Sequence, residues 1–238
     1  MQNLKTTRSL VNLRAGRNDW FRIENKAAAN TAEVYIYDEI GYFGTTADDF
    51  IKELQNLTQT KIDLHLNTPG GEVFDGIAIY NALKNHDAEV TVYVDALAAS
   101  AGSFIAMAGD TVIIEKTAQM MIHDAMSLAI GNSTDIRELA DRLDNMSNTI
   151  AGIYADKTGG SVEDWRNKMS AETWFNAQEA VGAGLADSIN GQATKTENTF
   201  DLSIFAYAGR DKAPAPVENK TELDFDPSNF RAALKGVS

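Results

Sequence analysis

Residues 89–108 read EVTVYVDALAASAGSFIAMA and contain the change of pattern on which the fold depends. Glu89–Asp95 alternates polar and apolar side chains with a period of two, which is typical of a strand with one buried face. Ala98–Ser103 then holds only alanine, glycine and serine, and Phe104–Ala108 is apolar on all sides, as expected of a short buried helix. A strand that leads into a buried helix through small residues predicts a sheet and a helix that share one core.

Strand and helix patterns alternate on both sides of this stretch. Helical spacing follows the capping-box sequence Thr46-x-x-Asp49 and appears again after Pro69-Gly70-Gly71. The predicted strands cover residues 32–38, 61–67, 89–95, 111–114 and 120–123. This alternation predicts an α/β fold.

A long amphipathic helix is predicted after the last of these strands. Ser133 or Thr134 can cap its start, and Thr158-Gly159-Gly160 marks its end. Its length of about 25 residues is roughly twice that of an average helix. We therefore expect this helix to project from the domain and to contact a partner.

The two ends of the chain lack the regular pattern. Residues 1–30 are predicted to form an N-terminal arm with one short strand at the apolar patch Trp20–Ile23. The compact domain is expected over residues 31–200. Residues 209–238 hold three of the four prolines and charges of both signs, which predicts a flexible tail with one short helix near Phe230–Leu234.

Composition excludes several classes of partner. The chain has 21 Lys and Arg against 34 Asp and Glu, and its net charge of -13 repels phosphate backbones and anionic lipid. We expect no nucleic-acid partner and no membrane partner. The longest uncharged stretch, residues 96–109, is shorter than the roughly 20 residues that cross a bilayer, and the polar N-terminus resembles no signal peptide. These features predict a soluble, cytoplasmic protein.

The cysteine and histidine content limits metal and thiol chemistry. The absence of cysteine excludes disulfides, thiolate metal sites and a cysteine nucleophile. The three histidines, His65, His86 and His123, lack the spacing of a metal-binding pair. We expect no metal site and no cofactor, although a magnesium site built from carboxylates stays open.

Three features combine into a candidate catalytic site. Ser100 lies where a strand turns into a helix, and the free N–H groups of a helix start favour a developing oxyanion. The simpler interpretation is that Ser100 or Ser103 only caps the helix. Pro69-Gly70-Gly71 also lies between a strand and a helix, where glycine lets a backbone N–H approach a ligand. His123 ends the apolar strand Met120–Ile122 and has the chemistry of a general base.

Together these residues resemble the ClpP serine peptidase family. The motifs similar to that family are Asn67-Thr68-Pro69-Gly70-Gly71, Ala98-Ala99-Ser100-Ala101-Gly102, Met121-Ile122-His123, Asn176-Ala177-Gln178-Glu179-Ala180 and Gly184-Leu185-Ala186-Asp187-Ser188. The resemblance covers about residues 32–190. It implies a ClpP/crotonase-like fold of repeated β-β-α units with a projecting handle helix at Ile136–Asp156.

The resemblance also implies roles for single residues. Ser100 would be the nucleophile, His123 its general base, and the N–H groups of Gly71 and Ala101 the oxyanion hole. Where the family places an aspartate as the third member of the triad, this sequence has Glu172. The alternatives for that carboxylate are Asp124 and Asp187, neither of which lies at the matching position.

The amino-acid sequences of two segments, Tyr35–Gly41 and Asp75–Leu83, are similar to those of the ClpP-like head maturation proteases of tailed phages. The resemblance implies an ATP-independent serine endopeptidase that forms a homo-oligomeric ring or barrel and processes scaffold or capsid proteins, in the bacterial host cytoplasm or inside the procapsid. The alternatives are a housekeeping ClpP-type subunit that works with an ATPase, and a catalytically silent assembly scaffold. Acyl-CoA chemistry on the related crotonase fold would leave the serine and histidine without a role and would need a basic patch for the CoA phosphates, which the acidic balance of the chain disfavours.

Overall fold

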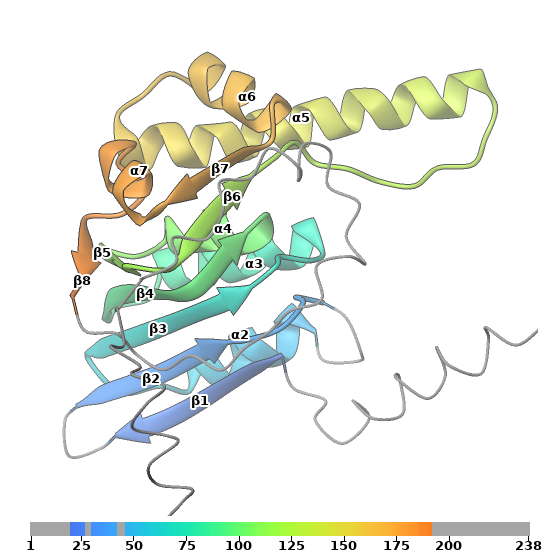
Figure 1. The fold of residues 1–238 in the computed structure, drawn as a ribbon. Helices are drawn as coiled ribbons and strands as arrows, with labels where there is room; N and C mark the ends of the chain where they lie inside the picture. Colours follow the sequence, from blue (N-terminus) through green and yellow to red (C-terminus); the bar gives the residue numbers. More distant parts are fainter. Residues whose placement is uncertain (1–19, 27–29, 42–45, 192–238) are drawn as a thin grey trace, which may run out of the picture.

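The computed structural model describes residues 20–26, 30–41 and 46–191, and these form one layered α/β unit (Figure 1). The strands are β1 (Phe21–Lys26), β2 (Thr31–Ile36), β3 (Lys61–Thr68), β4 (Glu89–Ala99), β5 (Thr111–Glu115), β6 (Gln119–Ile122), β7 (Thr173–Asn176) and β8 (Ser188–Asn190). The helices are α2 (Ala47–Gln55), α3 (Val73–Lys84), α4 (Ala101–Ala106), α5 (Ser133–Thr158), α6 (Val162–Ser170) and α7 (Ala177–Gly182). The α/β class predicted from the sequence is confirmed.

The sheet is mostly parallel and runs in the order β1-β2-β3-β4-β5-β8. Only β1 pairs antiparallel within this order, at the edge beside β2. The long strand β4 has two partners on the same side, because Thr91–Val94 pairs with β5 while Leu97–Ala99 pairs with β6. Strand β6 in turn pairs antiparallel with β7. The last residues of β4 therefore lie beside β6, and this arrangement sets up the site.

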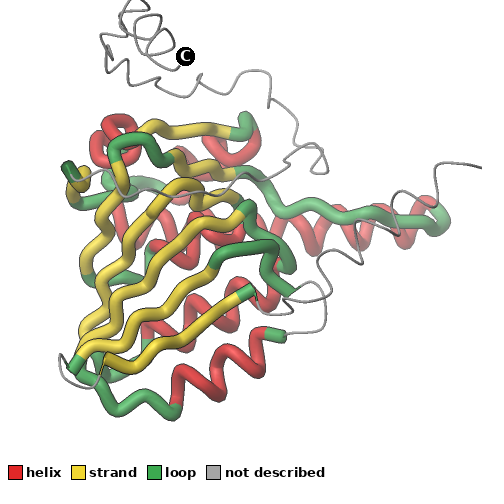
Figure 2. Tube along the Cα trace, turned by 60° about the horizontal axis from the view of Figure 1, so that its bottom comes forward, coloured by secondary structure: helices red, strands yellow, loops and turns green. Residues whose placement is uncertain are grey.

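The core lies between the sheet and the helices, which cover one face of it (Figure 2). Val34, Leu64 and Val92 are cross-strand neighbours on the buried face and are fully or almost fully buried. On the other face, the His65 ring stacks between Tyr35 and Tyr93, with ring centroids 4.8 and 4.9 Å away. The strict alternation explains why the strand patterns were readable from the sequence.

Helix α5 has 26 residues, and its N-terminal half extends beyond the sheet (Figures 1 and 2). The prediction that Ser133 or Thr134 caps it is wrong by one or two residues. Asn132 is the cap, because its side chain accepts hydrogen bonds from the N–H groups of Thr134 and Asp135. The predicted end is confirmed, since Gly159 has the left-handed φ of 76° that closes a helix.

The predicted arm is only partly within the described residues. The short strand expected at Trp20–Ile23 is found as β1, and Trp20 and Phe21 are buried in the core. The boundaries 1–30 and 31–200 stay predictions, and the predicted tail at 209–238 lies outside the described residues. Among residues 20–26, 30–41 and 46–191, no helix is long and apolar enough to cross a membrane.

Candidate active site

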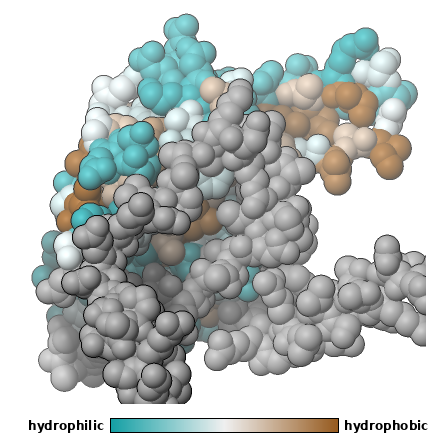
Figure 3. All heavy atoms as spheres, in the orientation of Figure 1, coloured by the Kyte–Doolittle hydropathy of each residue, from teal (hydrophilic) through white to brown (hydrophobic). Residues whose placement is uncertain are grey.

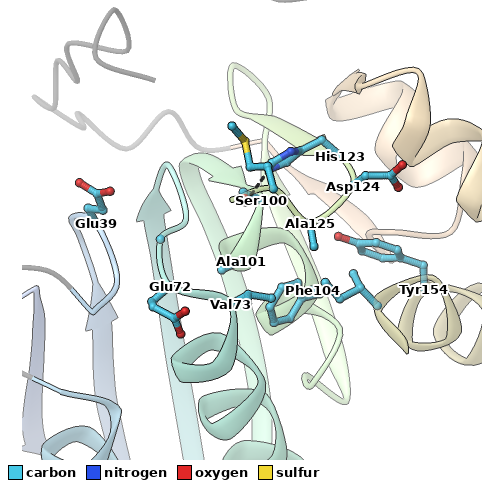
Figure 4. A pocket seen from close by; sticks show the side chains of 13 residues that line it. Glu39, Glu72, Val73, Ser100, Ala101, Phe104, His123, Asp124, Ala125 and Tyr154 are labelled. Carbon is cyan, nitrogen blue, oxygen red and sulfur yellow. Dashed lines mark hydrogen bonds between the residues drawn. The ribbon is translucent and has the colours of Figure 1, made fainter. Parts of the chain in front are cut away.

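Ser100 occupies the junction between β4 and α4 in a conformation that few residues adopt, with φ 51° and ψ -120°. Its N–H donates to the carbonyl of Met121 at 2.9 Å, which ties the junction to β6. The Ser100 hydroxyl makes no capping hydrogen bond, so the interpretation of Ser100 as a simple helix cap is wrong. Instead, Ser100 Oγ lies 2.7 Å from His123 Nε2 (Figure 4).

The small residues around Ser100 are required by a close backbone approach. A Cβ on Gly70, whose φ is 99°, would lie 2.6 Å from Ser100 Cβ, and a Cβ on Gly102 would lie 2.5 Å from Thr68 Cγ2. Both distances are shorter than real Cβ contacts. The glycine turn after β3 therefore packs directly on the start of α4, and this contact brings the two predicted oxyanion donors to one place.

Gly71 and Ala101 both line a pocket of about 330 Å³ beside Ser100. Ile40 donates to the carbonyl of Gly70 at 2.8 Å and accepts from the N–H of Glu72 at 3.0 Å, so it pairs with the residues that flank Gly71. In such a parallel bridge the N–H of the central residue points away from the partner strand. The Ala101 N–H is at the first position of α4, where a helix leaves its N–H groups unpaired.

His123 follows β6 directly, and Glu172 precedes β7. The antiparallel register ends with the pair Ile122 and Thr173, so His123 and Glu172, the residues just outside the two strands, are neighbours at this end of the pairing. Glu172 has a positive φ of 47°, and its Oε1 accepts a hydrogen bond of 3.2 Å from Trp174 Nε1. Strand pairing thus brings the backbone of Glu172 near that of His123, and the role of its carboxylate stays a prediction.

Burial lowers the pKa of His123 from its ordinary value of 6.5 to about 4. The imidazole is therefore neutral at pH 7, which is the state that accepts a proton from a serine hydroxyl. A neutral ring has one nitrogen that donates and one that accepts. The ring can serve as a base only if Nε2, the atom near Ser100 Oγ, is the accepting nitrogen.

The two alternative carboxylates are engaged elsewhere. Asp124 is paired with Arg166, which also contacts Asp144 at 3.1 Å. Burial is the largest influence on Asp124 and raises the pKa of its carboxyl, while the charge of Arg166 opposes that shift. Asp187 accepts from the N–H of Val112 at 2.7 Å, on β5. Glu172 also has a partner of its own in Trp174, so the choice among the three carboxylates stays a prediction.

The structure adds two residues that the sequence did not single out for the site. Tyr154 of α5 lines the pocket, and its hydroxyl lies 2.7 Å from Ser103 Oγ. Ser103 Oγ also lies 2.5 Å from the carbonyl oxygen of Ser100. Tyr154 could not have been found by motif, because at its position the helical pattern only indicates a core residue.

Comparison with known proteins agrees with this geometry. A family model described as Clp protease matches residues 16–193. The chain belongs to the Clp protease family. This is a family of serine peptidases, and the mixed α/β sheet with its helices is consistent with the ClpP/crotonase fold.

Several similar curated proteins are named as proteolytic subunits of ATP-dependent Clp proteases. The "ATP-dependent Clp protease proteolytic subunit 3" of Streptomyces coelicolor is 34% identical over 134 residues, which cover 55% of this chain and 61% of the relative. Subunit 2 of Rhodococcus jostii is 29% identical over 140 residues, covering 58% and 72%. Subunit 2 of Corynebacterium diphtheriae is 29% identical over 168 residues, covering 66% and 84%. The match to the first of these relatives thus spans less than two thirds of its length.

Proposed function

We propose that this Clp-family chain is a serine endopeptidase in which Ser100 and His123 carry out acyl transfer. The observation that carries the proposal is the 2.7 Å contact between Ser100 Oγ and His123 Nε2, two residues that line the same pocket. A neutral histidine within hydrogen-bond reach of a serine at a strained strand-helix junction is the arrangement that activates a hydroxyl for attack.

The first half of the reaction forms an acyl-enzyme. Ser100 Oγ attacks the carbonyl carbon of the scissile peptide bond while His123 Nε2 takes the hydroxyl proton. The N–H groups of Gly71 and Ala101 stabilise the oxyanion that develops on the carbonyl oxygen. His123 then gives its proton to the leaving amine, and the C–N bond breaks.

The second half releases the acyl group. A water molecule gives a proton to His123 and attacks the ester carbonyl, and the same two N–H groups stabilise the second oxyanion. Glu172 is the proposed third member, which orients the histidine and stabilises its charged form. The bond between the carbonyl carbon and Ser100 Oγ then breaks, Oγ takes the proton back from His123, and release of the acid product restores the starting state.

Two versions of this function differ in whether the chain works with an ATPase. The relatives named above are ATP-dependent subunits by their printed names, and they favour the alternative in which the chain works with an ATPase. A role in phage head maturation rests only on the sequence similarity of the segments at 35–41 and 75–83. It is the second candidate.

The assay that tests the proposal is hydrolysis of a fluorogenic peptide by the wild type and by Ser100→Ala. We expect activity in the wild type and none in the variant. The matched control is Ser127→Ala, because Ser127 is an exposed serine of the same region and should be dispensable. Equal background rates from an assembled wild type and Ser100→Ala would favour a silent scaffold instead.

A folded protein substrate then distinguishes the two versions. An ATPase-dependent subunit degrades it only when a Clp ATPase and ATP are added. Cleavage of scaffold or capsid protein in the absence of ATP would support the head-maturation role.

A further inference from the structure

A chain of hydrogen bonds connects helix α5 to the backbone of the proposed nucleophile. Ser103 is fully buried, and both its N–H, at 3.0 Å, and its Oγ, at 2.5 Å, donate to the carbonyl oxygen of Ser100. A serine hydroxyl has a single proton. Because that proton is directed at Ser100, the 2.7 Å contact between Ser103 and Tyr154 is one in which Tyr154 donates.

Tyr154 is well suited to hold this position. Its side chain is only 1% exposed and borders the pocket beside Ser100 (Figure 4). Burial raises the pKa of the Tyr154 phenol above its ordinary value, so the hydroxyl keeps its proton and stays a donor. The ring also contacts Trp165 of α6, with the centroids 5.3 Å apart, which restricts its orientation.

The carbonyl that receives these bonds belongs to a peptide unit of special importance. The C=O of Ser100 and the N–H of Ala101 share one planar, trans peptide group, so they point in opposite directions. Two donors that fix the oxygen of Ser100 therefore fix the direction of the Ala101 N–H. They also polarise the peptide group and make its N–H a stronger donor.

We propose that Tyr154 and Ser103 are positioning residues that aim the Ala101 N–H at the oxyanion of the reaction. The inference rests on the proposed function. It goes beyond that function because it assigns part of the transition-state stabilisation to a side chain of α5, the helix that projects from the domain. A displacement of α5 at this point would change the oxyanion hole without touching Ser100 or His123.

The test is the steady-state kinetics of Tyr154→Phe and Ser103→Ala with a peptide substrate. Tyr154→Phe keeps the ring that borders the pocket and removes only the donor. Loss of a direct oxyanion donor lowers kcat by about 10²–10³, so we expect a smaller loss of about 10-fold in kcat for an indirect one, with KM within about two-fold. The double variant should lose no more than Ser103→Ala alone, because both residues act through one path.

A transition-state mimic supplies a readout that packing alone would not move. The affinity for a peptide boronic acid, which forms a tetrahedral adduct on serine, should fall by the same factor as kcat. The matched control is Tyr80→Phe, a half-buried tyrosine of α3 that is not among the residues lining the pocket. It should leave both quantities unchanged.

Three results would overturn the inference: an unchanged kcat in both variants, a change confined to KM, or losses that multiply in the double variant. If Tyr154→Phe fails to fold, Ser103→Ala decides the question alone, since it removes one buried hydroxyl and keeps the helix. The proposed function fails separately, when Ser100→Ala is as active as the wild type. The inference about Tyr154 and Ser103 fails alone when Ser100→Ala is inactive while Tyr154→Phe and Ser103→Ala both have the kcat of the wild type.

Discussion

Ser100 has a backbone conformation that stores strain, because its φ of 51° with ψ of -120° is unfavourable for any residue with a Cβ. Such strain costs the folded protein about 1–3 kcal/mol, and glycine avoids it. Glycine in turn loses more conformational entropy on folding than alanine does, which costs about 0.5–1 kcal/mol. We therefore predict that Ser100→Gly is inactive yet more stable than Ser100→Ala by about 1 kcal/mol. Thermal unfolding of the two variants checks this, and a less stable glycine variant would contradict it.

The depressed pKa of His123 predicts how activity and stability depend on pH. Between pH 6.5 and about 4 the unfolded chain binds a proton at His123 that the folded protein does not, so this group makes folding less favourable as pH falls through that range. The same shift places the acidic limb of kcat/KM below pH 6.5. A limb at or above pH 7 would contradict this assignment. In denaturant titrations at pH 7 and pH 5, His123→Gln should lose less stability on acidification than the wild type.

The third triad position can be tested by removing one charge at a time. Glu172→Gln keeps the size of the side chain and loses the carboxylate that we propose as the partner of His123. We predict a loss in kcat of up to about 10³–10⁴-fold, the range known for the equivalent change in a serine triad. The control is Asp187→Asn, whose carboxylate binds the N–H of Val112 away from the site and should leave kcat near the wild-type value. The reverse outcome would move the role to Asp187.

Helices and strands show what the sequence could predict and what it could not. The strands around 61–67 and 89–95 were readable because each has one buried face, and Ser100 and His123 were readable because short motifs surround them. The pairing of β4 with both β5 and β6 could not be predicted, because strand pairing is a long-range property that no local sequence pattern encodes. The pairing of β6 with β7, which brings Glu172 near His123, is long-range in the same way, and the choice among three carboxylates stays open.

Contacts between side chains of different helices and strands also could not be predicted from the sequence. Arg166 of α6 binds Asp124 and Asp144, which lie beside His123 and on α5, and only the packing of α5 on α6 brings these groups together. The cap of α5 was misplaced because three consecutive residues, Asn132, Ser133 and Thr134, all have capping side chains. The choice among them depends on where the preceding loop ends.

The projecting end of α5 and the loop before it expose an apolar surface that a monomer does not explain. Met126 is 60% exposed, and Leu128 and Ile130 are fully exposed, while Ile136 lies nearby on the helix. Figure 3 shows the hydrophobic residues gathered on the projecting part. Burying one such side chain contributes about 1.5–3 kcal/mol. We predict that this surface contacts other copies of the chain.

Assembly should therefore respond to charge on this surface. We predict that the double substitution Leu128→Glu and Ile130→Glu lowers the molar mass measured by light scattering at micromolar concentration. Val162→Glu is the control, because Val162 is an exposed apolar residue on α6, outside the projecting part. A wild type that is monomeric, or a double variant with unchanged mass, would contradict the role given to this surface.

The most direct test of the central claim is covalent labelling with a fluorophosphonate, followed by intact mass and recorded together with the oligomeric state. The probe reacts much faster with a serine that a base activates than with an ordinary serine. We predict one adduct per chain in the wild type and in Ser127→Ala, and none in Ser100→Ala or His123→Ala. An assembled wild type that forms no adduct, or an adduct that persists in Ser100→Ala, would contradict the assignment of Ser100 as the nucleophile.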